Sequence, residues 1–502
     1  MYNLQLKMKK YIILCIIALL STTLYSQQPT ISQRLGDLES QRLIKVACIG
    51  NSVTYGYGHE NPDSTSYPSQ LAVMLGDDYE VGNFGKSGAT LLRKGHRPYN
   101  EQEEFKKALE FAPDIAIIHL GLNDTDPRNW KYYKREFISD YVALIEAFEK
   151  VNPDVEIYIC RMTPIFHWHH RFKKGTRDWY WEIQETIENI AYNIAEVKLI
   201  DLQETLYRRP DLMPDALHPN PEGAKLIAQR VYSAITGDFG GLSVPRIYSD
   251  NMVIQRDKPF VVKGLANTGE EISVSLGKQK IKTKAGDDGR WEVTFDALKV
   301  DGKNHKLTIK SKDKTLSFKN IVVGEVILCS GNKMSKDESQ KTKDFDHNPN
   351  NDIRLHYMDS DISSSWVKIE DIRSHVYIGE TLYNVGVKIS DSLQMPVGLI
   401  YKVVEDAPIE SFIDRKTLEW HPILIDVLYE WRNADNVKEH LDSNEPSYNY
   451  DKLIAPLSSF PINSVIWFED DSDIDSDLDS IKKSALIESW KKVLGEFSFI
   501  KM

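Results

Sequence analysis

The stretch IKVACIGNSVTYG, residues 44–56, decides the fold of the first half of this chain. It begins as a short apolar run, which is typical of a strand buried on both faces of a sheet. Gly50 and Asn51 end that run in a turn. A serine on the turn that leaves a buried strand lies at the carboxyl edge of the sheet, where a nucleophile meets its substrate. Gly-Asn-Ser is also an ordinary turn, so the stretch makes Ser52 a candidate that needs further support.

Strand and helix patterns alternate from Leu43 to about Thr236. This alternation indicates a parallel sheet with helices on both faces. Ligands of such sheets bind at the carboxyl ends of the strands. Strands are expected at Ile44–Ile49, Tyr79–Asn83, Ile115–Leu120, Glu156–Cys160 and Lys198–Asp201, and helices near Tyr67–Met74, Glu101–Phe111, Glu136–Glu149, Trp179–Ala195 and Pro221–Ile235.

Three further fragments of this region carry side chains or amides suited to acyl transfer. NFGKSGAT supplies Gly88, whose amide can donate to a developing oxyanion, and LGLND supplies Asn123, whose side chain can do the same. DALHPN supplies Asp215 and His218, at a spacing that lets the carboxylate reach one imidazole nitrogen while the other faces a serine. Taken singly, the fragments also fit a flexible loop, a helix cap and a surface histidine.

The four blocks together, in the order Ser, Gly, Asn, Asp-His, resemble the SGNH, or GDSL, hydrolase family over roughly residues 43–236. The resemblance implies a flavodoxin-like three-layer α/β/α fold and a two-step acyl-enzyme mechanism that uses no metal or other cofactor. It implies Ser52 as the nucleophile, His218 as the general base and Asp215 as the acid that orients the imidazole.

The same resemblance implies an oxyanion hole made of the Ser52 amide, the Gly88 amide and the Asn123 side chain. The chain departs from the family in one place, because Asn51 stands where the family usually has an aspartate. Asn51 is not the triad acid, so activity is expected to survive this change.

The segment of residues 166–181 follows the fourth expected strand and is expected to overhang the site. Its aromatic rings and interspersed donors suit sugar rings, although a structural loop with core aromatics explains them equally well. A metal site is the weaker interpretation of its histidines, since the serine mechanism needs no metal. The candidate substrate contacts are His167, Trp168, His169, Arg171 and Trp179.

After residue 238 the helical patterns vanish, and alternating segments separated by turns predict a small antiparallel β-sandwich. An α/β pattern returns after Gly324. We therefore expect a signal peptide at residues 1–27, a catalytic domain at 28–238, the sandwich at 239–323 and a second α/β domain at 324–502. The strand candidates of the sandwich are Glu271–Leu276, Arg290–Phe295, Lys306–Lys310 and Leu316–Val322.

The stretch PRIYSDNMVIQR, residues 245–256, resembles the opening of the sialate O-acetylesterase family, and VGEVILCSG, residues 323–331, continues the match. The serine that this family uses as its nucleophile is missing after residue 331, although Ser335 is a shifted alternative. Asp473 stands at the family's oxyanion asparagine, and no histidine follows His440. The resemblance therefore implies a degenerate, truncated second esterase unit.

The N-terminal segment and the composition indicate the compartment of the chain and argue against one class of partner. Three lysines before the apolar run Tyr11–Leu20 indicate a secretory signal peptide, and the run is short for a membrane-spanning helix. Export to the periplasm or the extracellular space is expected, with no integral membrane segment in the mature chain. A formal charge of -12 argues against nucleic acid as a partner. Cys48, Cys160 and Cys329 lie in apolar runs and are expected to be buried free thiols.

These observations predict an exported serine esterase that removes O-acyl groups, O-acetyl above all, from an acylated carbohydrate or polysaccharide. A lipase or thioesterase acting on small acyl esters is the alternative among enzymes. A non-catalytic glycan-binding protein is the alternative from another class. The four intact blocks argue against a non-catalytic binding protein, but only for the first domain.

Overall fold

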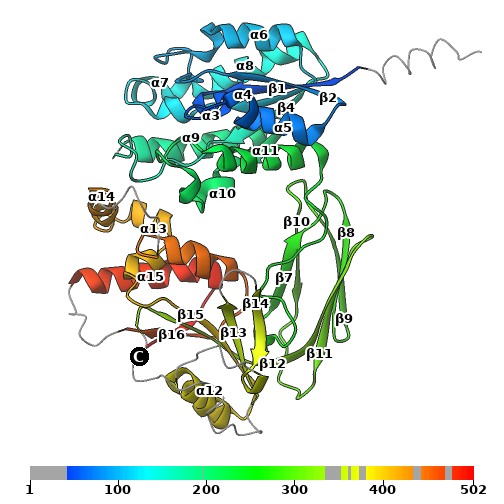
Figure 1. The fold of residues 1–502 in the computed structure, drawn as a ribbon, viewed down its shortest axis with the longest axis vertical. Helices are drawn as coiled ribbons and strands as arrows, with labels where there is room; N and C mark the ends of the chain where they lie inside the picture. Colours follow the sequence, from blue (N-terminus) through cyan, green and yellow to red (C-terminus); the bar gives the residue numbers. More distant parts are fainter. Residues whose placement is uncertain are drawn as a thin grey trace, which may run out of the picture.

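The computed structural model describes residues 42–173, 175–194, 196–333, 352–359, 363–371, 380–433, 443–469 and 477–502. The expected signal peptide lies outside these ranges, as do Ser335, His440 and Asp473. Figure 1 shows an α/β part drawn in blue to green, a β-rich part in green to yellow, and a second α/β part in olive to red. None of the described helices is long and apolar enough to cross a membrane.

The first part is built on a parallel five-stranded sheet in the order β2-β1-β3-β4-β5. This order confirms the flavodoxin-like prediction. Strand β2 lies on one side of β1, and β3, β4 and β5 follow in order on the other side, so the order of the strands switches between β1 and β3. Sheets of this kind form a ligand-binding crevice at the carboxyl ends of the strands at the switch point. The strands are β1 (Ile44–Gly50), β2 (Tyr79–Gly85), β3 (Ile115–His119), β4 (Glu156–Arg161) and β5 (Val197–Asp201).

Helices cover both faces of this sheet, and the longer ones lie close to their predicted positions (Figure 1). They are α5 (Tyr67–Leu75), α6 (Glu103–Phe111), α8 (Phe137–Val151), α9 (Thr176–Asn193) and α11 (Pro221–Thr236). Four short helices were not predicted, because a helix of four to six residues is too brief to show a hydrophobic period. They are α3 (Ser52–Tyr55), α4 (Pro62–Thr65), α7 (Trp130–Tyr133) and α10 (Leu202–Tyr207).

The β-rich part follows as a set of mainly antiparallel ladders, which join β7 to β10, β8 to β9, β8 to β11 and β11 to β12. Strand β10 alternates exposed and buried residues, as expected of a strand with one face on a core. The strands are β6 (Val253–Gln255), β7 (Phe260–Leu265), β8 (Glu271–Leu276), β9 (Gln279–Lys284), β10 (Arg290–Phe295), β11 (His305–Lys310) and β12 (Thr315–Gly331).

The last part is a mixed sheet in which β12 pairs in parallel with both β15 and β16. Helices α12 and α15 lie on opposite faces of this sheet in Figure 1. The strands are β13 (Ile353–Asp359), β14 (Ser363–Lys368), β15 (Val397–Val403), β16 (Ser464–Phe468) and β17 (Ser498–Lys501), and the helices are α12 (Glu380–Leu393), α13 (Arg415–Trp420), α14 (Ile425–Asn433) and α15 (Asp477–Leu494).

Strand β12 belongs to both of the later parts. Its first half pairs with β11 in the β-rich part, and its second half pairs with β15 and β16. The boundary expected between residues 323 and 324 therefore falls inside one continuous strand. A single core contains apolar side chains of both parts, from Leu242 to Leu494. The two parts are packed as one unit beneath the first domain.

All three cysteines of the described chain are buried and free, as the apolar runs predicted. Burial raises the pKa of the Cys48 thiol to about 12, so the thiol stays protonated at neutral pH.

Candidate active site

Ser52 is the first residue of α3 and is separated from the end of strand β1 by Asn51 alone. Asn51 caps this helix, since its Oδ1 accepts the Val53 N–H at 3.0 Å while its Nδ2 donates to the His119 carbonyl at 3.2 Å. The amide thus ties the turn after β1 to the end of β3. An aspartate could accept the first bond but, when ionised, could not donate the second. Ser52 opens a helix, so its own N–H has no partner within that helix.

His218 lies between Ser52 and Asp215. Its Nε2 is 2.9 Å from the Ser52 Oγ, and its Nδ1 is 2.7 Å from the Asp215 Oδ2. The other carboxylate oxygen of Asp215 accepts the backbone N–H groups of Leu217 and His218 at 3.0 and 2.6 Å. The turn that allows this passes through Ala216, whose φ of 64° is left-handed. The local spacing brings Asp215 to His218, and the fold brings Ser52 to the other side of the imidazole, so that the three side chains form one hydrogen-bonded row.

Asp215 is held in its ionised form. Partial burial alone raises the pKa of a carboxyl group, but the hydrogen bonds from the His218 side chain and the backbone outweigh it and lower the Asp215 pKa to about 2. Asp215 therefore carries its negative charge throughout the neutral range. A charged carboxylate at this position keeps the imidazole proton on Nδ1 and leaves Nε2 to face Ser52.

The loop after β2 lies beside the Ser52 turn, because the Lys86 N–H donates to the Gly50 carbonyl at 2.9 Å. Gly88, two residues on, has a φ of 79°, a backbone conformation that favours glycine. A side chain here would also crowd Arg97, whose Nη1 lies 3.2 Å from the place of a Cβ atom. The structure records no partner for the Gly88 N–H among the residues it describes.

Asn123 follows β3 and is nearly buried, with 5% of its surface exposed. Its Nδ2 donates to the Ala89 carbonyl at 3.0 Å, and its Oδ1 accepts from the Arg171 guanidinium at 3.4 Å. These bonds turn the amide nitrogen toward the loop that carries Gly88. Asn123 and Gly88 thus lie together, as their positions after successive parallel strands predicted.

Asp124 is a site residue whose role the sequence did not indicate. It is fully buried, and its two carboxylate oxygens accept the N–H groups of Leu91 and Leu92 at 2.9 and 2.8 Å. It thereby ties the loop after β2 to the loop after β3. Its position next to Asn123 in LGLND indicated that it lies near the site. A local pattern does not show which distant groups a carboxylate will bind.

We expect the buried Asp124 to make stability depend on pH. Burial raises the Asp124 pKa from 3.8 to about 7. Between these values the folded chain binds a proton that the unfolded chain releases, so this group makes the free energy of unfolding fall as pH rises from about 4 to 7. Asp124→Asn, which cannot ionise and can accept only one of the two N–H groups, should lower the free energy of unfolding and flatten that slope in denaturant titrations at several pH values. An unchanged slope would contradict the assignment.

The loop before α9 meets the site through two of the predicted contacts. The His169 Nδ1 accepts the Arg171 N–H at 3.2 Å, and the Arg171 side chain reaches Asn123. Burial, followed by the neighbouring charges of His170 and Arg171, lowers the His169 pKa to about 4, so that His169 is neutral at physiological pH. Trp168 is half-buried and stacks on Phe166, with ring centroids 4.9 Å apart.

His167 corrects the prediction made for this loop. Its side chain is fully buried, and its Nδ1 lies 3.1 Å from the Arg415 Nη1 of the last part of the chain. A side chain in this position has no surface to offer a sugar, so the prediction of a substrate contact is wrong for His167. Trp179 is half-buried in α9, packs against the core and stays a prediction. The described part of the chain contains no group of three or more His, Cys, Asp or Glu side chains that could hold a metal ion.

Comparison with known proteins supports the identity of this domain. Residues 48–226 match the model of the GDSL-like lipase/acylhydrolase family. A protein named acetylxylan esterase from Xylanibacter ruminicola is 36% identical over 215 residues, which cover 38% of this chain and 43% of that protein. Human sialate O-acetylesterase is 21% identical over 278 residues, which cover 49% of this chain and 52% of that protein.

Among solved structures, a carbohydrate acetylesterase from Xanthomonas citri aligns with a TM-score of 0.41 and 20% identity, over 51% of this chain and 59% of that one. The chain spans about half the length of the curated relatives that it matches. The chain joins a GDSL-like lipase/acylhydrolase domain, of the SGNH type, to a region that resembles sialate O-acetylesterase.

Proposed function

We propose that this protein is a serine esterase that removes O-acetyl groups from a carbohydrate. The observation that carries the proposal is the continuous row from the Ser52 Oγ through both nitrogens of His218 to the Asp215 carboxylate. A neutral imidazole in this position accepts the hydroxyl proton while the oxygen attacks an acyl carbon. Asp215 then stabilises the imidazolium that forms.

The reaction has two steps. The Ser52 Oγ bonds to the acetyl carbon, His218 takes the serine proton, and the N–H groups of Ser52, Gly88 and Asn123 stabilise the negative oxygen. His218 returns the proton to the sugar oxygen, which leaves as an alcohol, and an acetyl-serine remains. Water then attacks the acetyl-serine with His218 as the base, which releases acetate and restores Ser52.

A carbohydrate substrate is supported by the loop before α9, which reaches the site through Arg171. On this loop the half-buried Trp168 is an aromatic ring that contacts Phe166 and Trp431, and Arg171 and the exposed His170 are donors. Rings with adjacent donors suit the C–H faces and hydroxyl groups of sugars. The acetylxylan esterase and sialate O-acetylesterase relatives are named for acetylated carbohydrates. We also propose that the chain is exported, on the strength of its N-terminal signal pattern.

A direct assay separates this function from the alternatives. The purified protein should hydrolyse an aryl acetate faster than the matching aryl butyrate or octanoate, and should release acetate from acetylated xylan or from acetylated sialic acid. Preference for long acyl chains would indicate a lipase, and binding of glycans without turnover would indicate a binding protein. Ser52→Ala serves as the control for contaminating esterases.

A further inference from the structure

Helix α13 of the C-terminal part lies against the loop that leads into α9 of the catalytic domain. Arg415, at the start of α13, is 1% exposed, and its guanidinium lies 4.8 Å from the centre of the Phe166 ring. Its Nη1 is 3.1 Å from the His167 Nδ1. Its Nη2 also lies 3.9 Å from a carboxylate oxygen of the buried Glu445, an ion pair within the C-terminal part. The guanidinium is 6.0 Å from the centre of the Tyr207 ring in α10. Apart from the pair with Glu445, these contacts of the buried charge are all with the catalytic domain.

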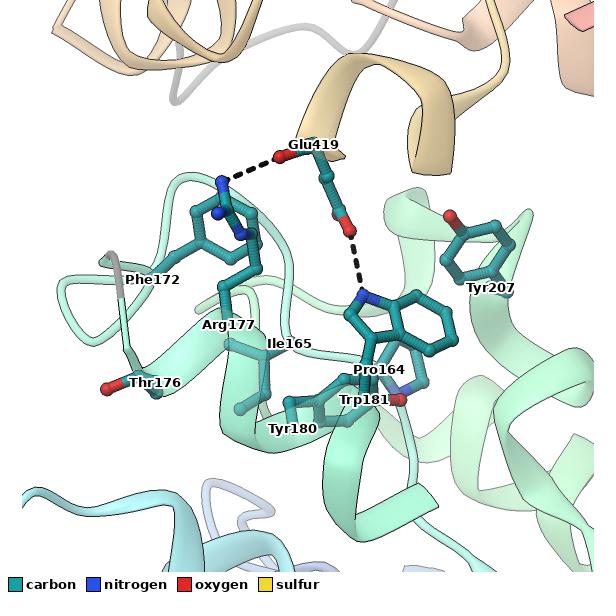
Figure 2. Close-up of a pocket in the computed structure, with 9 residues that line it drawn as sticks. All are labelled: Pro164, Ile165, Phe172, Thr176, Arg177, Tyr180, Trp181, Tyr207 and Glu419. Carbon is teal, nitrogen blue, oxygen red and sulfur yellow. Dashed lines mark hydrogen bonds between the residues drawn. The ribbon is translucent and has the colours of Figure 1, made fainter. Parts of the chain in front are cut away.

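Glu419 makes a second contact one turn further along α13. Figure 2 shows its carboxylate accepting the Trp181 Nε1–H and its backbone carbonyl accepting from Arg177. These distances are 3.2 and 2.6 Å. Trp181 and Arg177 lie in the first turns of α9, directly after the loop. Helix α13 thus holds the loop at its Phe166–His167 end through Arg415 and at its α9 end through Glu419.

The held loop in turn contacts the turn that carries the catalytic pair. The Phe166 N–H donates to the carbonyl of Ala216 at 2.9 Å, and Ala216 lies between Asp215 and His218 with a left-handed φ. A shift of Phe166 therefore moves the carbonyl that anchors this turn. The position of His218 relative to Ser52 depends on that turn.

We propose that Arg415 and Glu419 are positioning residues, through which the C-terminal part holds the Asp215–His218 turn in its reactive geometry. This inference rests on the proposed esterase function. It gives the sialate esterase-like region a role in catalysis that requires no nucleophile of its own and no contact with substrate. A catalytic group displaced by about 1 Å can lose roughly 100-fold in rate, so a holding contact can affect catalysis without touching the substrate.

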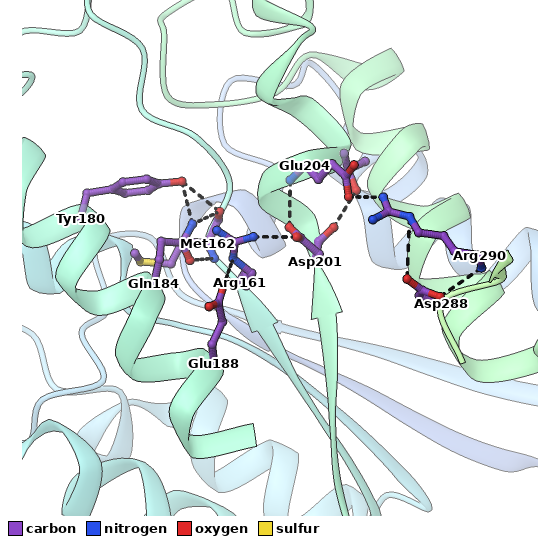
Figure 3. A network of polar contacts seen from close by, with 10 residues as sticks. Arg161, Met162, Tyr180, Gln184, Glu188, Asp201, Glu204, Asp288 and Arg290 are labelled. Carbon is purple, nitrogen blue, oxygen red and sulfur yellow. Dashed lines mark hydrogen bonds and ion pairs between the residues drawn. The ribbon is translucent and has the colours of Figure 1, made fainter. Parts of the chain in front are cut away.

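The test compares full-length Arg415→Met and Arg415→Lys with a matched control. Methionine keeps an unbranched side chain beside Phe166 but removes the charge, the bond to His167 and the ion pair with Glu445, whereas lysine keeps the charge. The control is Arg290→Gln in β10. Figure 3 shows Arg290 paired with Glu204 in the first turn of α10 in the catalytic domain. That change also removes an arginine that joins the catalytic domain to the rest of the molecule.

Two readouts separate positioning from stability. One is kcat and KM for an aryl acetate, and the other is the rate at which an aryl phosphonate modifies Ser52, which needs the triad but no sugar site. In Arg415→Met, kcat and the modification rate should fall together by about 10- to 100-fold while KM changes little. Arg415→Lys should recover part of both rates, and Arg290→Gln should leave both near wild type.

Wild-type rates in a folded Arg415→Met variant would overturn the proposal, even if its melting temperature fell. Equal losses in Arg290→Gln would also overturn it, because they would show that domain docking in general is responsible. If Arg415→Met does not fold, His167→Phe tests the same contact from the loop side and should show the same paired loss. A wild-type protein without esterase activity would instead disprove the proposed function itself.

Discussion

Replacing Ser52 or His218 by alanine is expected to lower kcat for an acetate ester by about 10⁴- to 10⁶-fold, because the members of a triad act as a unit. Without the Ser52 Oγ no acyl-enzyme forms, and without the imidazole the hydroxyl loses the proton acceptor that lies 2.9 Å away. Asp215→Ala should leave more activity, since it removes orientation and charge stabilisation but keeps the base. Initial rates with an aryl acetate measure all three variants.

The matched control for this experiment is His305→Ala. His305 also pairs with an aspartate, Asp301, at 3.1 Å, but it lies in the β-rich part of the chain. Its loss should leave kcat near wild type. If Ser52→Ala kept a tenth of the wild-type kcat, the triad assignment would be wrong, provided that the preparation is free of other esterases.

Replacing Asn123 by alanine is the change with the next largest expected effect, about 10²- to 10³-fold in kcat with a small change in KM. The Asn123 amide is turned toward the Gly88 loop by its bonds with Ala89 and Arg171, so it is ready to donate when negative charge develops. Asn123→Asp should be at least as harmful, since a carboxylate beside the oxyanion would repel it. Steady-state kinetics on both variants separates kcat from KM.

The control for Asn123 is Asn152→Ala. Asn152 ends α8, and its amide donates to the Pro113 carbonyl at 2.9 Å at the opposite edge of the sheet, where β3 and β4 begin. This change removes a structural amide and should leave kcat unchanged. A raised KM with wild-type kcat in Asn123→Ala would mean that Asn123 binds substrate instead of stabilising the transition state.

The region that resembles sialate O-acetylesterase forms a packed sheet, and its lack of a nucleophile stays a prediction from the sequence. At the end of β12, Asn332 occupies the segment where that family has its serine, and its N–H donates to the Phe468 carbonyl at 3.0 Å. The apolar strand segments of β12, β15 and β16 pair in parallel. A packed sheet with an altered active-site segment fits a supporting role, and the Arg415 contact supplies one.

The sequence by itself determined the first sheet and the place of the four blocks. Apolar runs at regular intervals identify parallel strands, and the carboxyl ends of neighbouring parallel strands meet at one edge. Ser52, Gly88 and Asn123 could therefore be placed together from their positions after β1, β2 and β3. The spacing of Asp215 and His218 also predicted their hydrogen bond, because that contact is local.

Only the tertiary structure decided which side chains of the loop before α9 face the site. His167 and His169 are two residues apart in one aromatic segment, yet one packs against Arg415 and the other lies near the triad. The partner of His167 is 248 residues away, and no local pattern encodes so distant a contact. The same holds for β12, whose two halves join different sheets. Hydrophobic periodicity indicates which face of a segment is buried. Which other segment packs against that face depends on the folding of the whole chain.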